Sequence, residues 1–369
     1  MKFAVGYQLP DDDEPTFAEL VREFREHVAE VYFPWTDLPS GRSLLVSCRE
    51  LDGEAVQAQL EQDLLALRRL GFKLDLLLNA SCYGGEAYSL SLVERVSSVI
   101  AHLLDLVGLD IVTTMSPLLA EAVKRRFPGI EVRASVNMRL GTARSLEYVA
   151  HLFDSYHVQR ECNRDPERLG KLHAWAEANG KRLLLLANSG CLSYCSVQTF
   201  HDNLVSHEAE AAEVQNAPAE APALCWSYLR ERRHWVRFLQ NTWVRPEDIH
   251  HYEPSFPLVK LATRMHAKPR RVLHAYVSQR YRGNLADLFE PGHGPLFAPF
   301  IIDNGRFPED WFARTSTCGQ HCEQCGYCAS VLAQVLVPTP EFDAVNRLPD
   351  PKRSQVPVSG AEGTDLTGS

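Results

Sequence analysis

The most reactive side chains in this sequence are cysteines, and they fall into two groups. The denser group consists of four thiols at short spacing, Cys318, Cys322, Cys325 and Cys328. Thiolates are strong ligands for zinc and iron, and packing alone does not explain four of them in so short a run. The run therefore predicts a metal site, filled by zinc or by an iron–sulfur cluster, with His321 as a spare nitrogen ligand.

Part of this run also has the spacing C-x3-C-x2-C, from Cys318 to Cys325, which is the fingerprint of radical S-adenosylmethionine enzymes. Those enzymes carry the motif after an early barrel strand and leave one iron open for the cofactor. Here the run follows the last expected strand, and Cys328 can close the open position. We therefore interpret the run as a closed, local metal site.

The second group is formed by Cys191, Cys195 and Cys225. The first two follow the apolar run Leu183–Ala187, which has the length of a buried strand, and the turn-forming residues Asn188-Ser189-Gly190 separate that strand from the thiols. Ligands in α/β folds are held where strands end and loops begin. Three thiols at such a position predict a 4Fe–4S cluster.

A cluster held by cysteines alone needs a fourth thiolate, and the sequence leaves its identity open. Cys162 ends the preceding strand, whereas Cys82 lies in the loop after the third strand. Cys48 is the weakest candidate, because the apolar residues before it indicate a small buried side chain.

The elements that position these thiols alternate between strand-length apolar segments and helix-length amphipathic segments. The expected strands are Phe3–Gln8, Val28–Pro34, Leu74–Asn79, Ile111–Met115, Val132–Met138, Ser155–Arg160, Leu183–Ala187 and Leu258–Ala262. The expected helices include Phe17–Val28, Ala55–Leu70, Leu90–Leu106, Pro117–Arg126, Ala143–Phe153 and Pro166–Asn179. Eight such units predict an α/β fold, a (β/α)8 TIM-like barrel with a cysteine-rich C-terminal extension; a doubly wound sheet is the alternative.

Polar residues follow several expected strands and, in a barrel, would meet at one rim. The candidate catalytic residues are Asn79, Asn137, Arg160, Glu161, Asn188 and His201. His201 lies in the loop after the seventh strand and could act as base or proton shuttle, since imidazole titrates near neutrality. Arg160, Arg164 or Arg264 would orient an anionic group through bidentate contacts.

Composition sets the expected domains and surroundings. The 369 residues carry a net charge of −9, and no apolar run approaches the length of a membrane span. Ten cysteines without a disulfide pattern predict a cytoplasmic protein with metal sites. Residues 1–300 would form the catalytic barrel with an acidic insertion at 208–223, residues 301–337 the four-cysteine extension, and residues 338–369 a disordered tail.

Four segments resemble the collagenase-like peptidase family of undefined catalytic mechanism. They are RECNRD (160–165), NSGCLSYCSVQTFHDNLVSH (188–207), WVRPEDIHHY (243–252) and YRGNLADLF (281–289). The resemblance implies a barrel-like core with a cysteine-held iron–sulfur cluster. It places Cys191 and Cys195 on cluster-ligand positions, makes Cys225 a plausible third ligand, and matches Glu161 to a polar motif. This sequence lacks the cysteine that some members carry after the second strand, since Trp35–Gly41 has none.

Members of that family perform oxygen-independent hydroxylation of a quinone precursor or of RNA bases, and others were named as peptidases. The resemblance therefore implies an iron–sulfur-dependent enzyme acting on a small molecule or a nucleobase, with an electron-transfer or accessory protein as partner. A peptidase and a non-catalytic metal-binding accessory protein remain the alternatives.

Overall fold

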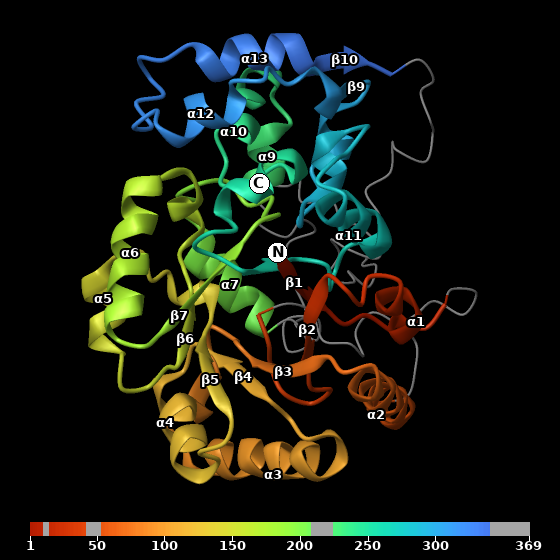
Figure 1. Ribbon diagram of the computed structural model, residues 1–369, viewed down its shortest axis with the longest axis vertical. Helices are drawn as coiled ribbons and strands as arrows, with labels where there is room; N and C mark the ends of the chain where they lie inside the picture. The colour runs from red at the N-terminus through yellow and green to blue at the C-terminus, as the bar shows by residue number, and fades with distance from the viewer. Residues whose placement is uncertain (10–14, 42–52, 208–223, 340–369) are drawn as a thin grey trace, which may run out of the picture.

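Eight parallel strands close into a barrel in chain order, with β1 paired to both β2 and β8. The computed structural model describes residues 1–9, 15–41, 53–207 and 224–339. The barrel strands are β1 Lys2–Gly6, β2 Val28–Pro34, β3 Lys73–Leu78, β4 Ile111–Thr114, β5 Glu131–Ala134, β6 Ser155–His157, β7 Arg182–Leu186 and β8 Leu258–Leu261. The predicted (β/α)8 TIM-like barrel is confirmed (Figure 1).

Helices surround the strands, as alternating elements require. They are α1 Phe17–Arg22, α2 Gly53–Arg69, α3 Leu90–Val107, α4 Pro117–Arg126, α5 Ala143–Tyr148, α6 Pro166–Ala178, α7 Gln198–Ser206, α9 Leu224–Leu229, α10 Val236–Leu239 and α11 Pro269–Val277. Local chemistry sets their starts. Ser116 caps α4 through Leu119 N–H and is followed by Pro117, while Asp165 caps α6 through Arg168 N–H and is followed by Pro166.

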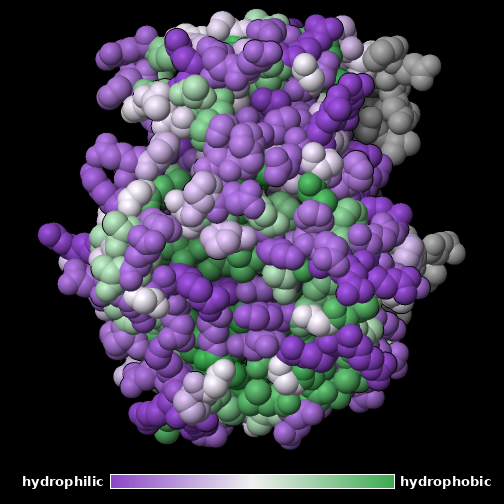
Figure 2. All heavy atoms as spheres, in the orientation of Figure 1, coloured by the Kyte–Doolittle hydropathy of each residue, from purple (hydrophilic) through white to green (hydrophobic). Residues whose placement is uncertain are grey.

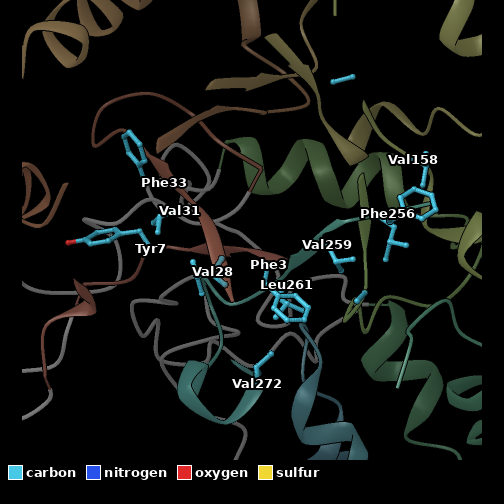
Figure 3. Close-up of a cluster of buried hydrophobic side chains, with 14 of the residues drawn as sticks. Phe3, Tyr7, Val28, Val31, Phe33, Val158, Phe256, Val259, Leu261 and Val272 are labelled. Carbon is cyan, nitrogen blue, oxygen red and sulfur yellow. The ribbon is translucent and has the colours of Figure 1, made fainter. Parts of the chain in front are cut away.

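The core lies mainly between the outer face of the barrel and its helices. Phe3 of β1, Val31 of β2 and Val259 of β8 are buried there, beside Val272 of α11 (Figure 3). Successive strand residues point to opposite faces, so the alternate positions look into the barrel. At those positions a small apolar cluster of Ala4, Tyr32 and Leu77 packs against Leu258, and the same alternation directs Ile111, Leu184 and Leu186 inward.

The barrel interior also holds a network of buried charges. Arg133 of β5 is fully buried and donates to both carboxylate oxygens of Glu30 on β2, at 2.6 and 3.1 Å. Its Nη1 also lies 3.7 Å from Asp75 of β3. Lys260 of β8 lies 3.9 Å from the ring centre of Tyr32. Pairing of opposite charges is the condition for burying them.

A C-terminal extension follows the barrel and packs onto one end of it (Figure 1). It contains β9 Phe300–Ile302, α12 Trp311–Ser316, α13 Tyr327–Val335 and β10 Leu336–Pro338. Strands β9 and β10 form an antiparallel pair, and α13 contacts α10. The predicted insertion at 208–223, Cys48 and residues 340–369 of the predicted tail lie outside the described residues.

Two expected strands end earlier than the apolar pattern suggested. Strand β5 stops at Ala134, because Ser135 accepts a hydrogen bond from Asn137 N–H and starts a 3-10 turn. Strand β6 stops at His157, and a 3-10 helix covers Arg160–Arg164. Within the described residues no helix has the length and apolar character needed to cross a membrane. Hydrophilic residues cover most of the face shown in Figure 2.

Candidate active site at the C-terminal mouth of the barrel

The segment that leaves β7 carries the first two thiols and is fixed on both sides. We call residues 188–197 the cysteine loop. Asn188 is fully buried, donates to the carbonyls of Ala262 and Leu288, and accepts from Ala262 N–H. Gly190 N–H donates to Glu290 O at 2.9 Å. The predicted site residue Asn188 thus ties β7 to β8 and to the 288–290 segment.

The same loop is anchored to the end of β6 through Glu161. One carboxylate oxygen of Glu161 accepts a hydrogen bond of 3.0 Å from Tyr194 N–H. Tyr194 has φ +51°, a left-handed conformation that is costly for a bulky residue. Arg160 is buried and donates to Ser189 Oγ at 3.0 Å. Strained backbone held by buried polar groups is typical of functional sites.

The third thiol predicted for this site, Cys225, lies on α9, 30 residues after Cys195 in the chain. Burial raises the pKa of the Cys225 thiol to about 12, and negative charge on Cys191 and Cys195 adds to the rise. Coordination to a metal removes such a thiol proton outright.

The two candidates for a fourth thiolate have the following neighbours. Cys162 is buried against α6, its Sγ lies 3.9 Å from Gly141 O, and burial raises its pKa to about 11, partly offset by Arg168. Cys82 Sγ accepts from Gly84 N–H at 3.4 Å in the loop after β3.

Two more predicted residues meet on the other side of the mouth. Asn79 Oδ1 accepts from Gly41 N–H at 3.0 Å, and Asn137 Nδ2 lies 3.4 Å from Asn79 O. A Cβ at Gly41 would approach both amide nitrogens within 3 Å, so glycine is needed for this contact. Arg264 follows the end of β8 in the sequence. Its side chain is buried and donates to Ser40 Oγ at 3.0 Å.

Helix α7 links several loops at the C-terminal ends of the strands. Its Asn203 accepts from Ser81 Oγ at 2.7 Å, after β3, and its Asp202 pairs with Arg139 at 3.1 Å, after β5. The predicted residue His201 lies on this helix and is half-buried. The helix therefore spans the end of the barrel where parallel-strand barrels hold their active sites.

The terminal run, residues 318–328, forms a second group. Burial raises the pKa of Cys328 to about 11; Arg164 opposes this rise, whereas Cys322, Cys318 and Cys325 add to it. Helix α13 begins at Tyr327, directly before Cys328.

Neither group is arranged around the position of a single ion. Among the described residues, no three His, Cys, Asp or Glu side chains converge closely enough to hold one metal ion. Zinc needs its thiolates about 2.3 Å from a common centre. An iron–sulfur cluster separates its ligands further, because several irons and sulfides lie between them. The thiol donor set itself suits an iron–sulfur cluster as well as zinc.

Two features of the site were missed from the sequence. One is the interior charge network, whose signal was the polar residues Glu30, Asp75, Arg133 and Lys260 inside apolar strands. The other is His293, fully buried beside Trp226, with ring centres 5.4 Å apart. Burial lowers the pKa of His293 to about 4. A cavity of about 540 Å³ lies at the opposite, N-terminal end of the barrel, and Glu30 of the charge network is part of its lining.

Comparison with known proteins supports the resemblance seen in the motifs. No family model matches the chain. An uncharacterized protease of Methanocaldococcus jannaschii is 25% identical over 275 residues, which are 72% of this chain and 77% of that protein. The match to the solved structure of the U32 peptidase Mk0906 covers 71% of this chain and 92% of the Mk0906 chain. The two are 19% identical, with a TM-score of 0.50. The chain is thus similar in sequence to a protein named as a protease, and its fold is similar to that of a U32 peptidase.

Proposed function

We propose that the protein is an enzyme related to the U32 peptidases, with its active site at the C-terminal mouth of the barrel and an iron–sulfur cluster on the cysteine loop. The observation that carries this proposal is the position of Cys191 and Cys195 on a loop that directly follows β7 and is fixed by the buried side chains of Asn188 and Arg160. Glu161 contacts the same loop through Tyr194 N–H. Thiol ligands and a carboxylate therefore share one rim, where this fold holds its reacting groups.

Peptides are the substrate class that we propose first. The named relatives support this class, and so do the exposed aromatic rings of Tyr194 and Phe200, which are 59% and 58% accessible beside the thiols. Hydrolysis adds one water across an amide and moves no electrons. Glu161 would take the proton of that water and Arg160 would orient a carbonyl or carboxylate. When bound, the cluster supplies a Lewis acid or an electron-transfer centre.

Oxygen-independent hydroxylation is the second candidate, and the terminal run favours it. A second thiol group beside the buried cation Arg164 suits a route for electrons. Conversion of C–H to C–OH with oxygen from water releases two electrons and two protons. An electron-acceptor protein would have to take those electrons, so this candidate implies a redox partner.

The test uses the full chain purified without oxygen, with iron and acid-labile sulfide measured first. The protein is then incubated with a mixed peptide pool and an electron acceptor, and products are read by mass spectrometry. Paired fragments that sum to a peptide plus one water support hydrolysis; an intact molecule with one added oxygen supports hydroxylation. Cys191→Ser and Glu161→Gln should abolish either product. If iron is bound but the variants match the wild type, the mouth is not the active site and an accessory role replaces catalysis.

A further inference from the structure

We propose that His293 is the fourth protein ligand of the cluster held by Cys191, Cys195 and Cys225. The proposal rests on the function proposed above and adds a ligand that the cysteine pattern does not contain. It makes the rim cluster a three-cysteine, one-histidine centre.

The first observation is the state of the imidazole. His293 is 0% exposed, and neither of its ring nitrogens has a hydrogen-bond partner among the described residues. Buried polar groups are nearly always satisfied, because an unpaired one keeps the full cost of losing its water. A buried ring with two unused nitrogens therefore indicates a partner that protein atoms do not supply. A metal centre is such a partner for imidazole.

The second observation is the way the backbone holds His293 beside the cysteine loop. Glu290 N–H donates to Asn188 O at 3.1 Å, and Gly190 N–H donates to Glu290 O at 2.9 Å. Ser189 and Glu290 also form a parallel bridge. A Cβ on Gly190 would collide with Pro291 O, so only glycine permits this pairing. The pairing places Pro291 against Gly190, the residue directly before Cys191. His293 follows Pro291 by two residues in the chain.

The third observation connects His293 to the remaining thiol. The Trp226 ring packs edge-on against the imidazole, with 5.4 Å between ring centres. Trp226 directly follows Cys225 in the chain. The immediate neighbours of two of the three thiols therefore contact the segment that carries His293.

The two thiols named as alternatives have contacts of their own. Cys162 Sγ lies 3.9 Å from Gly141 O, and Cys82 Sγ accepts from Gly84 N–H at 3.4 Å. Iron–sulfur clusters accept imidazole in place of thiolate, as Rieske centres show, and the exchange raises the reduction potential because a neutral ligand replaces an anionic one.

The test follows the ligand nitrogen spectroscopically in the full chain purified without oxygen. Pulsed EPR of the reduced protein, with and without ¹⁵N-labelled histidine, should show an imidazole nitrogen coupled to the rim cluster. His293→Cys should keep iron and sulfide, lose that coupling and lower the reduction potential. His321→Ala is the matched control, because it removes the histidine of the terminal run and should leave the signal in place.

The outcomes separate the two proposals. Iron retained by Cys191, Cys195 and Cys225 without any histidine coupling overturns the ligand proposal alone, as does a coupling that disappears in His321→Ala. If the Cys191→Ala variant binds as much iron as the wild type, the rim cluster is overturned, and the ligand proposal with it. His293→Phe fills the buried space without a ligand, so a folded variant with undiminished iron also contradicts the proposal.

Discussion

The guanidinium of Arg164 lies 4.9 Å from the ring centre of Trp243, and the ring of Trp311 lies 5.3 Å away. Its Nη1 donates to Leu239 O at 2.7 Å. Arg164 belongs to the short 3-10 helix after β6, whereas Trp311 begins α12 of the extension. One buried cation therefore joins the barrel to the cysteine-rich extension, and its positive charge favours the thiolate form of Cys328.

The first prediction concerns this cation. Arg164→Met should lower the free energy of unfolding by about 2 kcal/mol, because two desolvated cation–π contacts are lost. Metal bound by the terminal run should also fall, since the Cys328 thiolate loses a favourable charge. Arg314→Met is the control: Arg314 is exposed over Tyr327, 4.8 Å from its ring centre, and should cost about 0.5–1 kcal/mol. Denaturant unfolding and metal analysis measure both effects, and equal losses in the two variants would contradict the prediction.

The second prediction concerns pH and the barrel interior. Burial lowers the pKa of His157 well below its usual range, with Lys260 and Arg133 adding to the effect. The folded state then binds fewer protons than the unfolded state, so the stability from a neutral His157 is present above about pH 6.5 and is lost as the pH falls below it. Burial also raises the pKa of Asp75 to about 6. That group acts in the opposite direction, since its contribution is lost as the pH rises through 6.

In the His157→Gln variant, the pH dependence of the unfolding free energy should therefore show the contribution of Asp75 without that of His157. Relative to the variant, the wild type should lose about 1.4 kcal/mol of unfolding free energy per pH unit of acidification between about pH 6 and 5. Urea unfolding at several pH values gives this slope. His102→Gln replaces an exposed side chain on α3 and is the control. Parallel curves for the wild type and His157→Gln would show that His157 does not titrate as argued.

The third prediction concerns Gly190. Gly190→Ala places a Cβ against Pro291 O and should destabilise the protein by about 2 kcal/mol or more, since the paired backbone must move. The variant should also retain less iron on the cysteine loop. Gly170→Ala in α6 is the matched control, because its Cβ meets no atom and alanine favours helix by about 0.5–1 kcal/mol. A stable Gly190→Ala protein with full iron would contradict the arrangement.

The fourth prediction is that the two cysteine groups hold separate centres. Cys322→Ala should remove metal from the terminal run and loosen the extension, because a structural metal contributes folding free energy directly. Cys191→Ala should remove only the rim cluster. Iron, sulfide and zinc counts on both variants separate the sites. If either single variant lost all metal, one centre shared between the groups would be the correct picture.

The sequence by itself determined the barrel and the position of its mouth. Alternating apolar strands and amphipathic helices allow few topologies, because parallel strands need crossover helices and those crossovers have one hand. The sequence also determined that Cys191 and Cys195 lie in the loop after β7. The apolar run ends at Asn188-Ser189-Gly190, whose turn-forming side chains end a strand locally.

Only the tertiary structure decided which distant residues meet. Closure of the barrel brings Arg133 to Glu30, 103 residues apart, and so decides which of the charged strand residues pair with each other. The pairing of Glu290 with Asn188 and Gly190 sets His293 near the thiols, and the packing of Trp311 over Arg164 sets the second thiol group on the barrel. These contacts join residues that are far apart in the sequence. A local sequence pattern does not specify which distant residues meet, because that depends on how the whole chain folds.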